Sequence, residues 1–374
     1  MKKKFKLLIF LIILLFVFFL LSQLRKEITI IPNLSYEKDK EVAAQITEMR
    51  KNNNQSLLEK YKQLRIIDVH SHDVDALDLS ERRNNDNYTS VKDLWSKYGI
   101  DQTVLFGAVS DPTAIKSDLL SWRYYEQYPE KIYPSFAGVK IDKDGLSKVK
   151  QNLEIGYMHI GELFAAATYS PFASVRWKAK HPNDGNLPEV YDLASEYNVP
   201  VLLHIDPPKG LPMQQFELAM KNHPDTTFIF AHGNVHTSPQ YLRDLLDRNE
   251  NLMIDFFSGY TLHNPGGDYK LDDFARIVEE YPDRFVLGSD SGYEIGLENS
   301  YIAMYEFIDL LSPKTSAKVA YQNFEQLMER QAPTQEQINL IKKLTEEKGV
   351  ENKTYHLNKR EANELIFTLQ KMSN

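Results

Sequence analysis

Residues 66–72 of the 374-residue chain have the sequence Ile66-Ile67-Asp68-Val69-His70-Ser71-His72. A short apolar run of this kind is typical of a buried β-strand. His70 and His72 are two residues apart, so their side chains would point to the same side of such a strand. Further short apolar runs follow along the chain, and several also end in His, Asp or Glu. The prediction of the fold is therefore based on the repetition of this pattern along the chain.

Eight apolar runs are predicted to be strands, at residues 65–69, 103–109, 132–139, 158–163, 201–205, 227–231, 252–257 and 285–288. Segments with helical spacing lie between them, for example residues 187–197. Strands that alternate with helices indicate a parallel sheet covered on both faces. Eight such units between residues 65 and 330 favour an α/β fold with a closed (β/α)8 barrel, the TIM barrel. An open doubly wound sheet is the alternative, but no G-x-G-x-x-G follows the first strand.

Ligand-type residues stand at the ends of five of the eight predicted strands: His70 and His72, Glu162, His204, His232, and Asp290. A single strand-end histidine is usually an ordinary core or surface residue, so the inference depends on this coincidence. The C-terminal ends of barrel strands meet at one rim, where we expect these side chains to converge. Because the chain has no cysteine, a metal there would have nitrogen and oxygen ligands. This donor set suits one or two divalent ions, with Zn²⁺ expected and Mn²⁺, Ni²⁺ or Fe²⁺ as alternatives.

The motifs around these residues resemble the amidohydrolase superfamily of metal-dependent TIM-barrel enzymes. The order and spacing are similar to the amidohydrolase-2 branch, and a Gly-Glu element at residues 161–162 is similar to TatD-like hydrolases. The resemblance covers residues 65–330. It implies that His70 and His72 bind a first metal beside Asp290. It also implies that His204 and His232 bind a second metal or the substrate oxygen, and that Glu162 bridges or completes the site.

The same resemblance implies an enzyme, a metal-dependent hydrolase that cleaves a small ester, amide or lactone with a metal-activated hydroxide. Asp290, as proton shuttle, and His232 are the expected catalytic residues. Two alternatives stay open: a metal-dependent decarboxylase of an unsaturated carboxylic acid, and a non-catalytic surface binding protein on the same scaffold. Arg176 and Lys209 follow the fourth and fifth strands and are candidate anchors for an anionic substrate. Tyr260 and His263 are expected in a loop after the seventh strand.

The amino terminus carries four lysines before an unbroken run of 15 apolar residues at 7–21. Residues 5–24 are long enough to span a bilayer as a helix. We therefore predict a single-pass transmembrane anchor at residues 1–24, with a polar stalk at 25–64 and the catalytic domain on the extracytoplasmic side of the cell membrane. Secretion after signal cleavage is the alternative, although residues 22–26 offer no A-x-A-like site.

The carboxyl terminus, residues 331–374, is predicted to be a small appendage of two helices. Each helix begins with a capping box, formed by Thr334 with Gln337 and by Asn358 with Glu361. The net charge of the whole chain is −8, which argues against binding nucleic acid through a global basic field. We expect a small-molecule substrate, and the sequence does not predict an oligomeric state.

Overall fold

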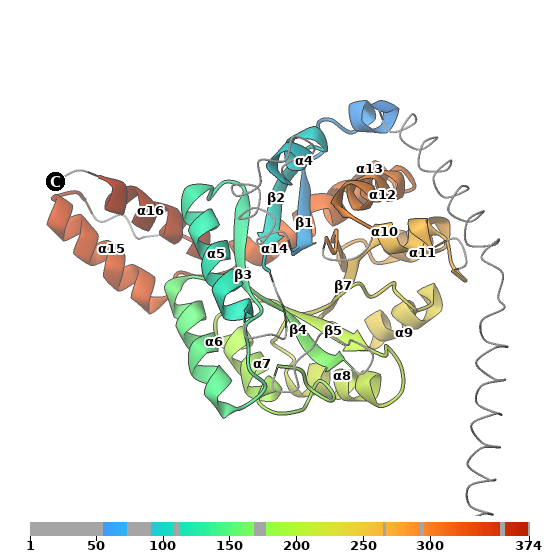
Figure 1. The fold of residues 1–374 in the computed structure, drawn as a ribbon, viewed down its shortest axis with the longest axis horizontal. Coiled ribbons are helices and arrows are strands. Elements are labelled where there is room, and N and C mark those ends of the chain that lie inside the picture. Colours follow the sequence, from blue (N-terminus) through green and yellow to red (C-terminus); the bar gives the residue numbers. More distant parts are fainter. Residues whose placement is uncertain are drawn as a thin grey trace, which may run out of the picture. The chain divides into compact units, whose positions relative to one another are not determined.

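Every predicted strand is present in the structure, a computed structural model that describes residues 55–72, 91–107, 109, 113–167, 177–264, 267–291, 295–351 and 356–372. The strands are β1 (Ile66–Ser71), β2 (Ile100–Leu105), β3 (Ile132–Phe136), β4 (His159–Ala167), β5 (Val201–Asp206), β6 (Phe228–Phe230), β7 (Leu252–Phe256) and β8 (Phe285–Leu287). All pairings are parallel, and the strands follow one another in sequence order around one sheet. The predicted α/β barrel is therefore confirmed (Figure 1).

The barrel closes where the residues after β8 meet β1. Ser289 donates its backbone N–H to the Asp68 carboxylate, and Asp290 donates its N–H to the carbonyl oxygen of His70, each at 2.9 Å. The hydroxyl of Ser289 donates to the same carbonyl oxygen at 3.1 Å. The seam between the first and last strands thus runs through two of the predicted metal ligands.

Helices follow the strands and cover the outside of the barrel (Figure 1). They are α4 (Val91–Lys97), α5 (Ala114–Gln127), α6 (Lys143–Ile155), α7 (Leu187–Glu196), α8 (Leu211–Asn222), α9 (Pro239–Arg248), α10 (Ser258–His263), α11 (Leu271–Glu280), α12 (Leu297–Asp309), α13 (Pro313–Ala317), the π-helix η1 (Lys318–Gln322), α14 (Asn323–Glu329), α15 (Gln335–Lys348) and α16 (Lys359–Lys371). The helix predicted at residues 187–197 corresponds to α7. The apolar sides of these helices pack against the outer faces of the strands to form the larger hydrophobic core.

The inside of the barrel is a second, separate core of buried side chains that includes Val69, Leu202 and Val286. Phe324 of α14 belongs to this inner core. The neighbouring Asn323 donates its side-chain amide to the carbonyl oxygens of Pro282 and Phe285, just before and at the start of β8, at 2.8 Å each. Because α14 packs there, the N-terminal end of the barrel is covered, and the C-terminal rim is the end that carries the predicted site residues.

The last two helices, α15 and α16, pack on the barrel rather than projecting from it. Both predicted capping boxes are present, Thr334 with Gln337 and Asn358 with Glu361. The ring of Phe367 meets that of Tyr125 in α5 edge to face, with centroids 5.3 Å apart. Asn363 donates to the carbonyl oxygen of Gly156, which caps α6, at 3.0 Å. These contacts explain why α15 and α16 belong to the same compact unit as the strands.

That compact unit begins at Ser56, so the last residues of the expected stalk form part of it. Leu57, Leu58, Tyr61 and Leu64 are partly buried against the core, because their spacing presents apolar side chains to one side. Among the described residues no helix is both long enough and apolar enough to cross a bilayer. The predicted anchor and most of the predicted stalk lie outside the described residues.

Candidate metal centre

The structure brings six of the predicted site residues together at the C-terminal ends of the strands. They come from the end of β1, from β4 and β5, and from the turns after β6 and β8: His70, His72, Glu162, His204, His232 and Asp290. Of the two predicted substrate anchors, Lys209 is exposed after β5 and is not part of this cluster, and Arg176 lies outside the described residues.

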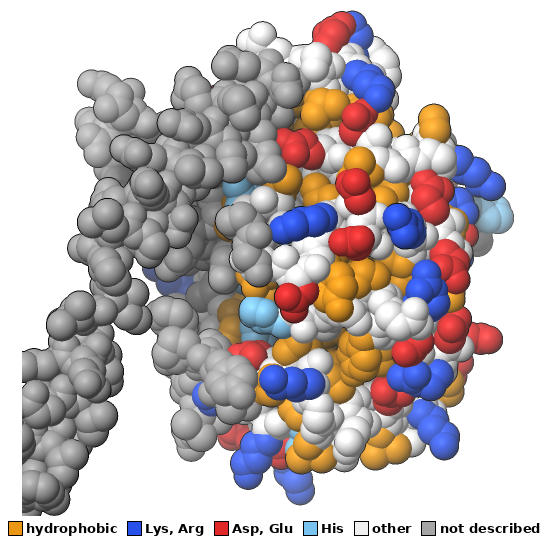
Figure 2. All heavy atoms as spheres, turned by 90° about the vertical axis from the view of Figure 1, so that its right-hand side faces the viewer, with side chains coloured by type: hydrophobic (Ala, Val, Ile, Leu, Met, Phe, Trp, Pro, Cys, Tyr) orange, Lys and Arg blue, Asp and Glu red, His pale blue; other side chains and the backbone are white. Residues whose placement is uncertain are grey.

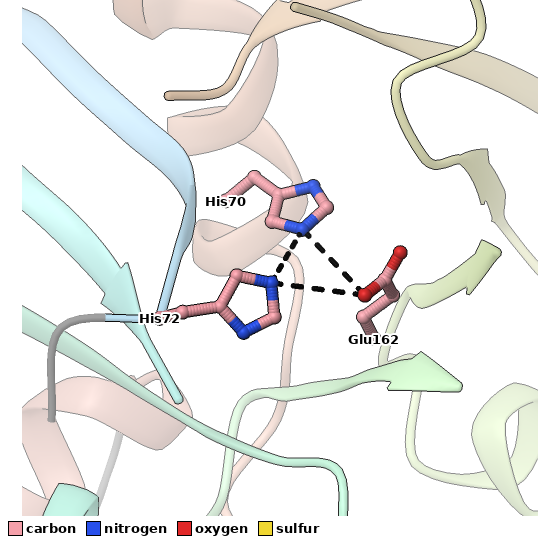
Figure 3. A group of neighbouring side chains, drawn as sticks. All are labelled: His70, His72 and Glu162. Carbon is pink, nitrogen blue, oxygen red and sulfur yellow. Dashed lines mark hydrogen bonds and ion pairs between the residues drawn. The ribbon is translucent and has the colours of Figure 1, made fainter. Parts of the chain in front are cut away.

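Four of these side chains form a first ligand group. The Nε2 atom of His70 lies 3.9 Å from Glu162 Oε2 and 3.6 Å from Asp290 Oδ1. The Nε2 atom of His72 lies 3.7 Å and 3.6 Å from the same two oxygens. Ligand atoms around a tetrahedral ion with bonds of about 2.1 Å stand about 3.4 Å apart. The group therefore has the dimensions of a metal site, and Figure 3 shows His70, His72 and Glu162 pointing at a common centre.

The two histidines of this group face each other through their Nε2 atoms. The Nδ1 atom of His70 lies 2.7 Å from a carboxylate oxygen of Asp255, and Nδ1 of His72 lies 2.9 Å from the carbonyl oxygen of Gly107. Because both partners are acceptors, each neutral ring carries its proton on Nδ1 and a lone pair on Nε2. These two Nε2 atoms are 3.1 Å apart. Two lone pairs at that distance repel each other unless a proton or a cation lies between them, so the donor set fits a metal ion.

A second ligand group shares Glu162 with the first. Its other oxygen, Oε1, lies 2.9 Å from His204 Nδ1 and 3.0 Å from His232 Nε2, and those two nitrogens are 3.1 Å apart. The remaining ring nitrogen of His204, Nε2, is buried and has no hydrogen-bond partner among the described residues. One carboxylate thus presents one oxygen to each group, and the second group can hold either an ion or a hydrogen-bonded substrate.

The comparison with family models agrees with this geometry. The amidohydrolase family model matches residues 170–337, which include His204, His232 and Asp290. The match covers 168 of the 374 residues, so the chain resembles this family over the C-terminal part of its barrel, while His70, His72 and Glu162 lie before the matched range. The resemblance inferred from the strand-end motifs is confirmed.

Among the solved structures that match this chain, one with a TM-score above 0.5 shows the same barrel fold. It is an uncharacterised TIM-barrel protein from Bordetella bronchiseptica, 18% identical with a TM-score of 0.52, over 71% of this chain and 98% of that chain. A probable 2-pyrone-4,6-dicarboxylic acid hydrolase from Acinetobacter baumannii is 15% identical with a TM-score of 0.47, over 70% and 98%. A dihydroorotase from Campylobacter jejuni is 15% identical with a TM-score of 0.46, over 71% and 83%. A search among curated proteins found no match.

The electrostatics of the site favour a positive charge at the first group. Burial lowers the pKa of His70, but the carboxylates around it, chiefly Asp255 and Asp290, outweigh burial and raise that pKa to about 10. Burial raises the pKa of Glu162, but the imidazoles around it outweigh burial and hold the pKa well below its usual range. The Glu162 carboxylate is therefore ionised, and the ring of His70 binds a proton strongly when no other cation is present.

Asp255 is the functional residue that sequence reasoning missed. It lies in β7, fully buried, and one of its oxygens accepts a hydrogen bond from the ring of His70. The available signal was an ionisable residue in the otherwise apolar strand Leu252–Phe256. Ser291 was also missed; its hydroxyl accepts the backbone N–H of His72 at 2.8 Å and so helps to place that ligand.

Two other histidines, His159 and His223, lie outside the ligand groups. His159 precedes Glu162 on β4 but is buried in the barrel, with its Nδ1 atom 2.9 Å from the hydroxyl of Ser135. Burial and the nearby charge of His70 lower the pKa of His159 to about 3, so its ring is neutral. His223, the C-cap of α8, has its ring 2.8 Å from Asp192.

The prediction of a loop for Tyr260 and His263 is wrong, because both belong to the short helix α10. Asn234 explains this local fold: its side chain donates to the carbonyl oxygen of Phe257 and to the hydroxyl of Thr261, which ties α10 to the turn after β6. Tyr260 lines a cavity of about 450 Å³ between that turn and the start of α11. The cavity lies on the C-terminal side of the barrel, on the same side as the ligand groups.

Proposed function

We propose that this chain is an enzyme of the amidohydrolase superfamily, a metal-dependent hydrolase that cleaves an ester, amide or lactone bond in a small molecule. The observation that carries the proposal is the pair of Nε2 atoms of His70 and His72, which face each other 3.1 Å apart while both Nδ1 atoms are hydrogen-bonded to acceptors. Two carboxyl side chains, those of Glu162 and Asp290, complete the first ligand group. A site of this kind has no evident role in stabilising the barrel, because buried charges left without a counter-ion are costly.

The first group would hold the ion through His70, His72, Glu162 and Asp290, and the second group, Glu162 with His204 and His232, would take either a second ion or the substrate. When bound, a divalent cation supplies a Lewis acid and lowers the pKa of a bound water to about 7. Zn²⁺ and Mn²⁺ both suit this donor set of imidazoles and carboxylates.

The chain's own residues would then position and protonate the substrate. Asp290 is partly exposed while its backbone N–H is held by the carbonyl oxygen of His70, so its carboxylate can accept a proton at a fixed place. Burial lowers the pKa of His232, but the hydrogen bond and charge of Glu162, together with the charge of Asp290, outweigh burial and raise it. A proton on this ring would be available for the substrate oxygen on which negative charge develops.

No described observation favours the decarboxylase. That alternative would gain from a cationic pocket, but Lys209 is exposed and Arg176 lies outside the described residues. On the face of the molecule in Figure 2, the described Lys and Arg side chains are interspersed with Asp and Glu. We therefore propose a small-molecule substrate rather than nucleic acid.

The ligand groups are tested first by metal analysis of the full-length protein. We expect at least one equivalent of divalent metal in the wild type and its loss in His70→Ala. His223→Ala removes an imidazole of the same chemistry outside the site, and it should retain the metal. Equal metal in wild type and His70→Ala would overturn the proposed centre.

The reaction class is tested with substrates in ¹⁸O-labelled water. A hydrolase places one solvent oxygen in its product when it cleaves an ester, amide or lactone. A decarboxylase releases CO₂ and leaves no solvent oxygen in the remaining product. Finding CO₂ release without ¹⁸O incorporation would replace the proposed hydrolase by the alternative while keeping the same metal ligands.

A further inference from the structure

Asp255 occupies an unusual position for a carboxylate. It is the fourth residue of β7, all five residues of which are buried, and its own exposed fraction is 0%. Burying an ionised carboxylate is unfavourable unless hydrogen bonds or opposite charges compensate it. The contacts of Asp255 therefore indicate the role of its buried carboxylate.

A single oxygen of Asp255 receives hydrogen bonds from both ligand groups. Oδ2 accepts the Nδ1–H of His70 at 2.7 Å and the backbone N–H of His232 at 2.9 Å. His70 comes from β1 and His232 from the turn after β6, so the two donors are far apart in the sequence. Asp255 is thus a direct link between the first and the second group.

Each of these hydrogen bonds fixes a property that a ligand needs. A carboxylate cannot donate, so the bond to His70 keeps the proton on Nδ1 and leaves the Nε2 lone pair directed at the centre. His232 has a φ of 37°, in the left-handed region that is strained for a residue with a side chain. The bond to its backbone N–H helps to hold that conformation, and with it the direction of the ring.

The Asp255 carboxylate is packed closely against the glycine that follows β8. The other oxygen of Asp255, Oδ1, is buried and has no hydrogen-bond partner among the described residues. A Cβ atom added at Gly288 would lie 2.2 Å from that oxygen and 2.5 Å from the Cβ of His70. Gly288 therefore allows the carboxylate and the His70 ring to come together at the end of β8.

We propose that Asp255 is a positioning residue for both ligand groups, which sets the tautomer of His70 and holds the backbone of His232. This inference rests on the proposed metal centre for its consequence, a high metal affinity, but not for the tautomer itself. Asp255 would not contact the ion or the substrate. It would act through the two histidines.

The test compares full-length wild type with Asp255→Asn, which keeps the size of the side chain and removes its charge. Zn²⁺ affinity is measured by competition with a chelating indicator, and we expect it to fall about 10- to 100-fold, as for other partners that orient metal-bound histidines. Asp118→Asn is the matched control. Asp118 is also a buried aspartate with two backbone N–H donors, from Ala137 and Gly138, but it lies in α5, outside the ligand groups. Its substitution should cost stability without changing the Zn²⁺ affinity.

A second readout separates positioning from a general loss of structure. The metal-free protein with ¹⁵N-labelled histidine is studied above pH 10, because the His70 ring becomes neutral only there. Its ring shifts then report which nitrogen carries the proton, and the His70 signals are those lost in His70→Asn. We expect the Nδ1–H form in the wild type and in Asp118→Asn, and a mixture in Asp255→Asn. An unchanged tautomer together with an unchanged Zn²⁺ affinity in Asp255→Asn would overturn the inference. Failure of the wild type to bind any divalent ion would instead overturn the proposed centre, and the tautomer would still decide the role of Asp255.

Discussion

Lys359 lies against the ring of Tyr197, with its Nζ atom 5.7 Å from the ring centroid and 3.4 Å from the Tyr197 carbonyl oxygen. It is the first residue of α16, and its exposed fraction is 0%. Burial lowers the pKa of Lys359 from 10.5 to about 7. The folded protein therefore releases this proton near neutral pH, whereas the unfolded chain keeps it to about pH 10.5. The free energy of unfolding should rise with pH between these two values because of this residue.

Lys359→Met is expected to stabilise the protein at pH 7, on the order of 1–3 kcal/mol, because an apolar side chain of similar length replaces a buried amine. The advantage over wild type should shrink as the pH approaches 10.5. Urea unfolding of both proteins at pH 7, 8.5 and 10 measures it. Lys343→Met, at an exposed position of α15, is the control and should show no such trend. A difference that is constant with pH would contradict the assigned pKa.

Removal of divalent metal is expected to lower the melting temperature of the wild type. A ligand that binds only the folded state stabilises it by about 2.7 kcal/mol at 100 times its dissociation constant. Thermal unfolding after treatment with a chelator, followed by addition of Zn²⁺, Mn²⁺ or Mg²⁺, measures the effect and ranks the ions. His70→Ala should melt at one temperature in all of these conditions. A wild-type melting temperature that no ion changes would contradict the presence of a bound metal.

Gly288→Ala is expected to weaken metal binding, because its new Cβ would overlap Asp255 Oδ1 and the His70 side chain. Either the carboxylate or the imidazole must move, and both support the first ligand group. Gly296→Ala is a suitable control: an added Cβ meets nothing there, but the φ of 80° and ψ of 151° make the substitution cost about 1–3 kcal/mol of stability. Equal Zn²⁺ affinities in the two variants would show that the close contact at Gly288 is not needed.

We also propose that residues 5–24 anchor the chain in the cell membrane with the barrel outside the cytoplasm. Deleting residues 1–24 should then move the protein from the membrane fraction to the soluble fraction, with its metal content unchanged. In the full-length protein, protease added to intact cells should cleave the barrel domain. A secreted product that has lost its first residues would support signal cleavage in place of an anchor.

The strands and the first group of ligands could be predicted because their signals are local. Each strand is a short apolar run, and the residue after it stands at the rim whatever the rest of the chain does. The pair His70 and His72 needs only the two-residue period of a strand to converge on one side. For the same reason, His159 could be recognised as out of phase with Glu162.

Other features depend on partners far away in the sequence. Asp255 accepts a hydrogen bond from His70, 185 residues before it, and nothing beside Asp255 in the sequence indicates that partner. The helix α10 was expected to be a loop because its stability depends on Asn234, which lies after the preceding strand. The residues around 55–64 were assigned to the stalk because their polar composition conceals a few apolar side chains that face the core.

The contact between the first and last strands depends on whether the ion position at the C-terminal rim is occupied. Asp290 and His70 join the last strand to the first by a backbone hydrogen bond, and their side chains face one ion position. A cation bound there would hold the first and the last strand together. Losing it should loosen this edge before any other, so that amide hydrogens near residues 68–72 and 287–291 exchange with solvent sooner than those of the opposite strands.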